Sequence, residues 1–196
     1  YRPNEWKLLN ASDFGVPQLR PRVLMVAIRQ DEPGIFEWPT LSIGIKTPTV
    51  GEVLHDLMSS RGWKNADSWR KRANAIAPTI VGGSKKHGGP DLGPTRAKRA
   101  WAELGVNGNK LAYDPPDVDF EGMPCLTVRM VARIQGFPDE WLFYGANTTA
   151  YRQVGNAFPP PVARAVGIQL SNCLSAPGSI SKKIFTRKRQ EELVAV

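Results

Sequence analysis

Cysteine and long apolar runs are scarce in this sequence. Its two cysteines, Cys125 and Cys173, lie far apart and fit no metal-ligand spacing, so we expect neither a disulfide framework nor a cysteine-based metal site. No apolar stretch is long enough to cross a bilayer, and no apolar segment follows the first charges as it would in a signal peptide. These absences favour a protein of a reducing cytoplasm, with no membrane anchor and no bound metal.

Positive charge is the strongest bias of the composition. Lysine and arginine number 26 against 18 acidic residues, and the net charge of +8 indicates an acidic partner, with nucleic acid first among the candidates. The charge alone is equally compatible with an ordinary basic protein. Six tryptophans, seven phenylalanines and a hydrophobic content of 41% predict a packed core rather than a disordered chain.

Residues 6–29 have the pattern of a β-hairpin. A short apolar segment, 6–10, and a continuous apolar run, 23–28, flank a loop marked by glycine and proline. A run that is apolar on both faces predicts a strand buried between layers of helices. Such a sheet needs several strands, so the others are expected outside this chain. The chain starts at Tyr1 without an initiator methionine, and we expect it to be a piece of a longer protein.

Helical spacing and capping residues predict several helices. Thr49, with Glu52 three residues later, has the pattern of a capping box, and Thr127 is placed to cap a later helix. The last helix is amphipathic, with Pro160 and Pro161 near its first turn. The rest of the region between the first and third helices is expected to be irregular. The predicted helices cover residues 49–58, 95–104, 127–135 and 162–174.

A first candidate functional segment is Gln18-Leu19-Arg20-Pro21-Arg22. In an extended chain the side chains alternate, so Gln18, Arg20 and Arg22 point to the same side. Two guanidinium groups on one side form a planar, multi-donor surface for a phosphate or a base edge. The alternative is that the arginines simply pair with local carboxylates such as Asp13.

Two further segments carry polar groups in suggestive places. Arg129 and Arg133 are four residues apart and share one helix face, which is also the pattern of an ordinary solvated surface. Gly155-Asn156-Ala157 reads as a turn just before a helix, whose exposed N–H groups near a positive helix end would suit a carboxylate or phosphate. A plain glycine–asparagine turn is the alternative.

In this order, the three segments resemble the last conserved blocks of the bacterial DNA (cytosine-5)-methyltransferase family. There, Gln-x-Arg-x-Arg precedes a variable recognition region, which is followed by Arg-x-x-Ala-Arg-x-Gln-Gly-Phe-Pro and then Gly-Asn-Ala-Val-Pro-Pro. Met130 and Phe158 depart mildly from the pattern, since an acid and a valine are common at these places. The resemblance covers about residues 6–170. The matching residues are Gln18, Arg20, Arg22, Arg129, Ala132, Arg133, Gln135, Gly136, Phe137, Pro138, Gly155, Asn156, Ala157, Pro159 and Pro160.

The resemblance implies an α/β fold in two parts. One is an incomplete S-adenosylmethionine-dependent, Rossmann-like methyltransferase portion, and the other is a small, irregular, mixed α+β target-recognition domain. The expected organisation is the last strand hairpin of the catalytic domain over residues 1–30, the target-recognition domain over 31–150, a C-terminal helix returning to the catalytic domain over 151–175 and a polar tail over 176–196.

The resemblance also implies an activity. Family members transfer a methyl group from S-adenosylmethionine, without a metal, to carbon 5 of a cytosine flipped out of the duplex, usually as part of a bacterial restriction-modification system. By resemblance, Arg22 is expected to hold the cytosine carbonyl oxygen while negative charge builds on the ring, with Arg20 supporting the catalytic site. Asn156 and Ala157 correspond to a turn at the methionine end of the cofactor. Structural roles are expected for Gln18, Arg129, Arg133, Gln135 and Gly155.

Double-stranded DNA is the expected partner. Glycines around a basic loop let the backbone approach bases and phosphates closely, and basic side chains on a following helix can position a protein on phosphates. For any single residue, a flexible basic loop without DNA contacts is an equally open interpretation. The residues expected to contact DNA are Thr79, Lys85, Lys86, His87, Arg96, Lys98 and Arg99.

Some blocks of the family do not occur in this sequence: the glycine-rich cofactor loop, the Pro-Cys-Gln nucleophile block and the Glu-Asn-Val block. Pro124-Cys125 lacks the following glutamine, and Cys125 and Cys173 are both expected to be structural. We therefore expect the chain alone to be inactive and to need a missing N-terminal catalytic segment or subunit. It is then a fragment of a longer enzyme or the smaller subunit of a split methyltransferase. A non-catalytic DNA-binding module and, more remotely, a basic protein–protein adaptor stay open.

Overall fold

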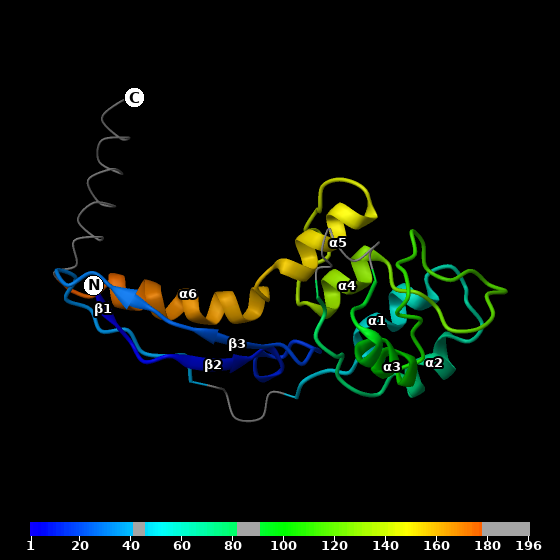
Figure 1. Cartoon of the computed structure of the whole chain (residues 1–196), viewed down its shortest axis with the longest axis horizontal. Helices are drawn as coiled ribbons and strands as arrows, with labels where there is room; N and C mark the ends of the chain where they lie inside the picture. The colour runs from blue at the N-terminus through cyan, green and yellow to red at the C-terminus, as the bar shows by residue number, and fades with distance from the viewer. Residues whose placement is uncertain (41–45, 82–90, 178–196) are drawn as a thin grey trace.

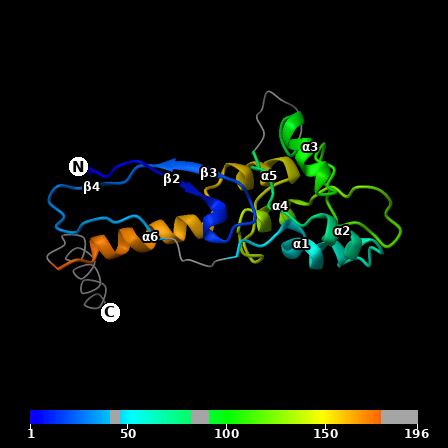
Figure 2. The same ribbon diagram turned by 90° about the horizontal axis from the view of Figure 1, so that it is seen from below.

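The chain forms an elongated molecule with two parts (Figure 1). The computed structural model describes residues 1–40, 46–81 and 91–177. The strands and the long helix α6 (Pro160–Leu174) form one end, and the helices α1 to α5 form the other. Figure 2 shows the same division from below, with α6 again running alongside the strands.

The N-terminal strands form the expected hairpin, interrupted by a break. The strands pair antiparallel, β1 with β4 and β2 with β3, so the ribbon has a short outer and a longer inner ladder. In the inner ladder Leu8 lies opposite Val23, and Leu9 lies opposite Arg22. The connecting loop contains a short 3-10 helix, η1 (Ala11–Phe14). The strands span Arg2–Pro3 (β1), Lys7–Asn10 (β2), Pro21–Leu24 (β3) and Ala27–Ile28 (β4).

Only one face of the hairpin is covered by the part of the chain that the structure describes. Leu9 and Ile28 are buried against α6, whereas Leu8, Val23 and Met25 keep 58%, 60% and 57% of their surface exposed. The described residues therefore cover the run 23–28 on one face, and burial of its other face by strands outside this chain stays a prediction. The side chains alternate in and out as the strand pleat dictates.

The helix α6 closes the covered face of the hairpin. Val162, Val166 and Cys173 point into the shared core, as the predicted amphipathic pattern requires. Pro160 lies at its first turn, where the absent N–H costs the helix no hydrogen bond. Gly34 passes so close to the C-terminal end of the helix that a Cβ there would lie 1.9 Å from the carbonyl oxygen of Cys173.

Local capping explains where two of the remaining helices begin. Thr49 Oγ1 accepts a hydrogen bond from the N–H of Glu52 at 3.2 Å, and the N–H of Thr49 donates to the Glu52 carboxylate at 2.7 Å, which confirms the predicted capping box. Thr127 caps its helix through the N–H of Met130, also as predicted. The helices span Val50–Ser59 (α1), Ala66–Arg72 (α2), Thr95–Glu103 (α3), Val128–Ile134 (α4) and Asn147–Asn156 (α5).

A second hydrophobic core holds these helices together. α1 packs on α2 and α4, and α4 packs on α5. Trp69 and Trp101 fill its centre with Tyr151 from α5. The packing differs from the expected domain boundaries. Tyr151 belongs to this second core, although the boundary was expected at residue 150. Phe36 belongs to the hairpin core, although the target-recognition domain was expected to begin at residue 31.

The helical part differs from the expected mixed α+β domain. From residue 46 to residue 177 the described chain contains helices and isolated β-bridges but no strand of two or more residues. The helix α2 lies in a stretch that was expected to be irregular, whereas α3 matches the predicted helix over 95–104. Among the helices that the structure describes, none has the length and apolar character needed to span a membrane.

Candidate functional site

The three candidate segments meet at one buried polar cluster, which we call the hub and which consists of Gln18, Arg20 and Gln135. The side-chain amides of Gln18 and Gln135 are fully buried, and Gln18 Nε2 donates to Gln135 Oε1 at 2.6 Å. Gln135 Nε2 in turn donates to the backbone oxygens of Val154 at 2.9 Å and Ala157 at 3.1 Å. Segments that are more than a hundred residues apart are therefore joined by side chains that have no access to water.

Arg20 completes the hub by binding backbone oxygens. Its Nη1 donates to Ile80 O at 2.5 Å, and its Nη2 donates to Gly155 O at 2.7 Å and Ala157 O at 3.0 Å. Burial and the neighbouring charge of Arg22 lower the pKa of Arg20 to about 10, so the group stays cationic at neutral pH. The side chain is 2% exposed. This geometry suits a positioning role, and the supporting role in the catalytic site that the resemblance implies for Arg20 stays a prediction.

Ile80 is held by the hub through both of its backbone groups. Its N–H donates to Gln18 Oε1 at 2.8 Å, while its carbonyl accepts the bond from Arg20. Just before it, Ala77 forms a parallel bridge with Gln18. The backbone bridge at Ala77 and the side chains of Gln18 and Arg20 together fix residues 77–80 against the end of the hairpin.

Arg22 differs from Arg20 in its surroundings. Burial alternates along the segment, so Arg22 points to the same side as Gln18 and Arg20, as the extended pattern predicts. Its guanidinium is only partly buried, and the hydrogen bond that the structure gives it is a local one, from Nη1 to Pro21 O at 2.8 Å. Arg22 therefore keeps donors directed to solvent at the border of the hub, where a ligand could reach them.

The Gly155-Asn156-Ala157 segment lies at the C-terminal end of a helix, so the expected turn before a helix is wrong. The helix α5 continues through Asn156, and α6 starts only at Pro160. The N–H of Ala157 is used by the carbonyls of Gln153 and Val154. The end therefore carries negative partial charge, which Arg20 and Gln135 partly neutralise, and the side chain of Asn156 is exposed beside it.

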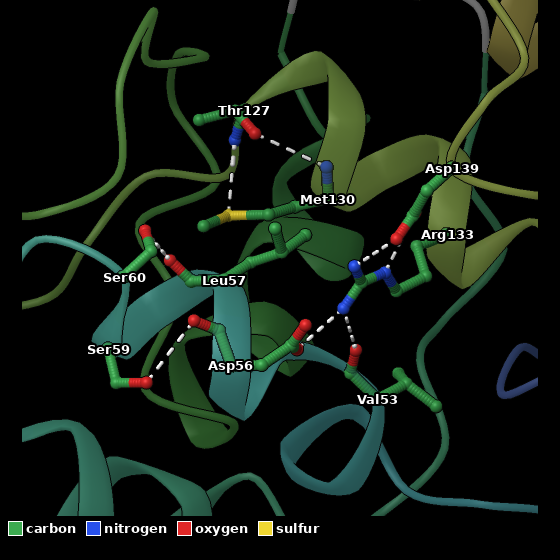
Figure 3. Close-up of polar contacts among 9 residues, drawn as sticks. All are labelled: Val53, Asp56, Leu57, Ser59, Ser60, Thr127, Met130, Arg133 and Asp139. Atoms are coloured by element: carbon green, nitrogen blue, oxygen red, sulfur yellow. Dashed lines mark hydrogen bonds and ion pairs between the residues drawn. The ribbon is translucent and has the colours of Figure 1, made fainter.

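Arg133 fastens α4 to α1, as Figure 3 shows. Its Nη1 donates to Asp56 Oδ1 at 2.5 Å and to Val53 O at 3.1 Å, and its other nitrogens bind the carboxylate of Asp139. Hydrogen bonds to Asp139 and Asp56 raise the pKa of Arg133, and the bond from Arg133 lowers the pKa of Asp56. Arg133 is therefore bound within the protein and is not simply part of a solvated charged face.

Arg129, on the same helix, organises the loop that follows α4. Its guanidinium donates to Pro138 O at 3.2 Å and to Trp141 O at 2.5 Å, and it lies 5.9 Å from the ring centre of Phe143. Gly136, which ends α4, has a φ of +86°, a conformation that favours glycine. Both arginines are therefore committed to intramolecular contacts.

The residues expected to contact DNA lie in different surroundings. Arg96 and Arg99 are exposed on α3, whereas Lys98 forms an ion pair with Asp91 at 2.8 Å. The hydroxyl of Thr79 donates to the backbone oxygen of Leu19, so it is turned inward. The remaining candidates, Lys85, Lys86 and His87, lie outside the described residues.

The cysteines lack the surroundings of a nucleophile. Cys173 is buried in the hairpin core, and burial raises the pKa of the partly buried Cys125 thiol, so that the reactive thiolate is disfavoured at neutral pH. Within the residues that the structure covers, no group of His, Cys, Asp and Glu is arranged to hold a metal ion.

Sequence reasoning did not single out Tyr151 or Ile80. Tyr151 reads as one more apolar position of α5, although its hydroxyl contacts two carbonyl oxygens. Ile80 takes part through backbone atoms, which leave no trace in a sequence. An open groove of about 620 Å³ between η1 and α6 has Asp13 and Arg164 in its lining, but the predicted catalytic and cofactor residues do not line it.

Known proteins resemble this chain over most of its length. Residues 1–172 match the family described as C-5 cytosine-specific DNA methylase. Type II methyltransferase M.NaeI of Lentzea aerocolonigenes is 58% identical over 177 residues, which are 89% of this chain and 42% of that protein. Type II methyltransferase M.NgoMIV of Neisseria gonorrhoeae is 49% identical over 174 residues, which are 87% of this chain and 54% of that protein. The chain therefore spans about half the length of these relatives.

Among solved structures, the S. pombe Dnmt2 methyltransferase aligns with 86% of this chain and 57% of its own, at 16% sequence identity and a TM-score of 0.45. Membership of the family is shown by the sequence matches and not by this structural likeness.

Proposed function

Because the chain belongs to the C-5 cytosine-specific DNA methylase family, we propose that it is the DNA-recognition and cofactor-completing part of a DNA (cytosine-5)-methyltransferase. The observation that carries the proposal is the meeting of the three family segments at the hub. Residues that are far apart in the sequence form one connected arrangement. Arg22 lies at its border, and Asn156 is exposed at the end of α5. As in its Type II relatives, we place the complete enzyme in a restriction-modification system.

Arg22 is the residue that we assign to the reacting base. A cytosine must leave the stack before its carbon 5 becomes accessible. The solvent-directed donors of Arg22 then bind the carbonyl oxygen of the flipped base and stabilise the negative charge that builds on the ring. Arg20, held by three backbone oxygens, keeps the neighbouring chain fixed while Arg22 acts.

Asn156 and Ala157 are assigned to S-adenosylmethionine. The amide of Asn156 is exposed and can both donate and accept, which fits the carboxylate and ammonium groups of an amino-acid moiety. The negative partial charge of the helix end favours the ammonium group. The cofactor, when bound, supplies the activated methyl group, and no metal is needed.

The chain is proposed to act together with the rest of a methyltransferase. Its sequence has no Pro-Cys-Gln block, and the raised pKa of Cys125 makes that thiol a poor substitute. The uncovered apolar face of the hairpin, with Leu8, Val23 and Met25, supports packing against the remaining catalytic sheet. That sheet, together with this hairpin and α6, would form the Rossmann-like domain.

Double-stranded DNA is the proposed partner of the helical part. Arg96 and Arg99 present exposed charges that suit phosphate contacts, with Lys98 held beside them by Asp91. Thr79, Lys85, Lys86 and His87 remain proposed DNA contacts from the segment that precedes α3 in the sequence, although the inward hydroxyl of Thr79 leaves only its methyl group and backbone for that role.

A methyl-transfer assay with labelled S-adenosylmethionine and mixed-sequence duplex DNA tests the proposal. It compares this chain alone with a protein that also carries the cofactor-binding and nucleophile blocks of the family. Activity in the second sample and none in the first is the expected result. Activity of the chain alone would contradict the proposal that the nucleophile lies outside this chain. Cys125 would then be the first residue to replace. DNA binding without activity in either sample would favour a non-catalytic DNA-binding module.

A further inference from the structure

The hydroxyl of Tyr151 joins two segments that are far from it in the sequence. Tyr151 is fully buried on α5, and its oxygen lies 2.7 Å from Val81 O and 2.7 Å from Asp91 O. Both partners are acceptors, so the single hydroxyl proton is shared between them. Burial raises the pKa of Tyr151, and the group therefore stays a neutral donor at any physiological pH. The two carbonyls are held side by side by this one group.

Each of the two segments leads to residues proposed to contact DNA. Val81 directly follows Ile80, whose backbone is fixed by the hub. Asp91 binds Lys98 on α3 at 2.8 Å through its side chain, and its Oδ1 also accepts from the N–H of Gly93 at 3.1 Å. The position of α3, with its exposed Arg96 and Arg99, is thus linked to the Tyr151 hydroxyl through the backbone of Asp91.

The helix α5 connects this contact with the proposed cofactor end of the chain. Tyr151 is one helical turn before Gly155, and the last carbonyls of the helix are held by Arg20 and Gln135. The helix is therefore anchored at its C-terminal end to the hub and in its middle, through Tyr151, to Val81 and Asp91. Near its start, Asn147 Nδ2 also donates to Ala112 O at 3.1 Å, but the contact with Val81 and Asp91 is made by the Tyr151 hydroxyl.

We propose that Tyr151 is a positioning residue that sets the place of Val81 and Asp91, and through Asp91 that of α3, relative to the catalytic part of the enzyme. This inference rests on the proposed function, because it needs DNA to be bound by the helical part. The hydroxyl does not touch DNA or the cofactor. Its loss loosens Val81 and Asp91 while the ring still fills the core, so DNA recognition suffers and the cofactor end stays intact.

The test is Tyr151→Phe in the complete methyltransferase, with Tyr113→Phe as a matched control because Tyr113 is 80% exposed in the same part of the molecule. We expect the KM for DNA to rise about tenfold for Tyr151→Phe, because two partly buried acceptors lose their donor, while the KM for S-adenosylmethionine stays the same. A KM does not depend on the fraction of active enzyme, so general destabilisation would lower kcat without this split.

Amide hydrogen exchange supplies a second measurement that needs no DNA. Residues 79–81 and 91–93 should exchange faster in Tyr151→Phe, and the backbone of α1 should not change. Unchanged exchange would overturn the anchoring role itself. Faster exchange with an unchanged KM for DNA would overturn the role in recognition. If the unmodified enzyme and the Tyr113→Phe control also fail to bind DNA, it is the proposed function that fails.

Discussion

Gln18 and Gln135 are 117 residues apart in the sequence, yet their buried side-chain amides share a hydrogen bond of 2.6 Å. The direction of this bond is fixed by the backbone. Gln18 Oε1 accepts from the N–H of Ile80, which leaves its Nε2 to donate, and Gln135 Nε2 is already committed to Val154 O and Ala157 O. Neither amide can rotate without leaving several groups unpaired.

Replacing either glutamine of the hub should destabilise the folded protein. We expect Gln135→Leu and Gln18→Leu each to lower the free energy of unfolding by about 1–3 kcal/mol, because buried donors and acceptors lose their partners. The double variant should cost less than the sum of the two, since the shared bond is lost only once. Urea denaturation of the four proteins measures this coupling. The control is Gln153→Leu, because Gln153 on α5 binds the carbonyls of Tyr144 and Thr149 through exposed hydrogen bonds. Strict additivity would contradict a shared hub.

Replacing Arg22 should separate catalysis from binding. In the complete enzyme Arg22→Ala is expected to lower kcat about a hundredfold or more, because charge on the cytosine ring loses its donor, while the KM for DNA changes little. Steady-state kinetics with duplex DNA give both values. Arg29→Ala removes an exposed arginine that pairs with Asp31 elsewhere in the hairpin region and should leave kcat unchanged. An Arg22→Ala enzyme with normal turnover would remove the catalytic assignment.

The exposed arginines of α3 should determine part of the salt dependence of DNA binding. If Arg96 and Arg99 each neutralise one phosphate, every replacement by glutamine reduces the slope of log K against log salt by about 0.9. DNA titrations at several salt concentrations provide the slopes. Lys64→Gln is a matched control, because Lys64 is exposed but paired with Asp119 at 2.7 Å. Slopes that do not respond to Arg96 or Arg99 would place the phosphate contacts elsewhere.

The contact between Asp56 and Arg133 should make stability depend on acid pH. The bond from Arg133 lowers the folded pKa of Asp56 below the unfolded value of 3.8, so its contribution is fully present above that value and is lost as the pH falls through the folded pKa. Asp56→Asn should therefore lower the melting temperature at neutral pH, and the difference from the unmodified protein should shrink below pH 3.8. Asp114→Asn, which affects a looser pair with Arg61 at 3.7 Å, is the control. A difference that is constant over this pH range would contradict the argument.

The sequence predicts those parts of the fold that depend on neighbouring residues. The starts of α1 and α4 follow from threonine caps whose partners lie three residues on, at Glu52 and Met130. The helix α2 is missed because its seven residues hold a single large apolar anchor, Trp69, and the surface that it needs comes from α1. The end of α5 is misjudged because Gly155 and Asn156 favour a turn locally, whereas Arg20 from the hairpin binds the carbonyl of Gly155.

The candidate site, too, is predictable only where it depends on neighbouring residues. Alternation predicts which way Gln18, Arg20 and Arg22 point, and the burial pattern agrees. What they bind is not predictable in this way, because the partners of Arg20 are backbone oxygens 60 and more residues away. A carbonyl has the same chemistry in every residue, so the sequence carries no mark of it. The resemblance to a family names the residues, and the structure supplies their contacts.

The arrangement of the hub sets an order of events during synthesis. Gly155 and Ala157, which accept hydrogen bonds from Arg20, are made more than a hundred residues after it. Parts of a chain that are made earlier usually fold first on the ribosome, yet here the charge of Arg20 must remain hydrated until α5 exists. The hairpin and the helical part are therefore joined late in translation. In a nascent chain that stops before residue 157, Arg20 lacks the acceptor Ala157 O and stays exposed to water.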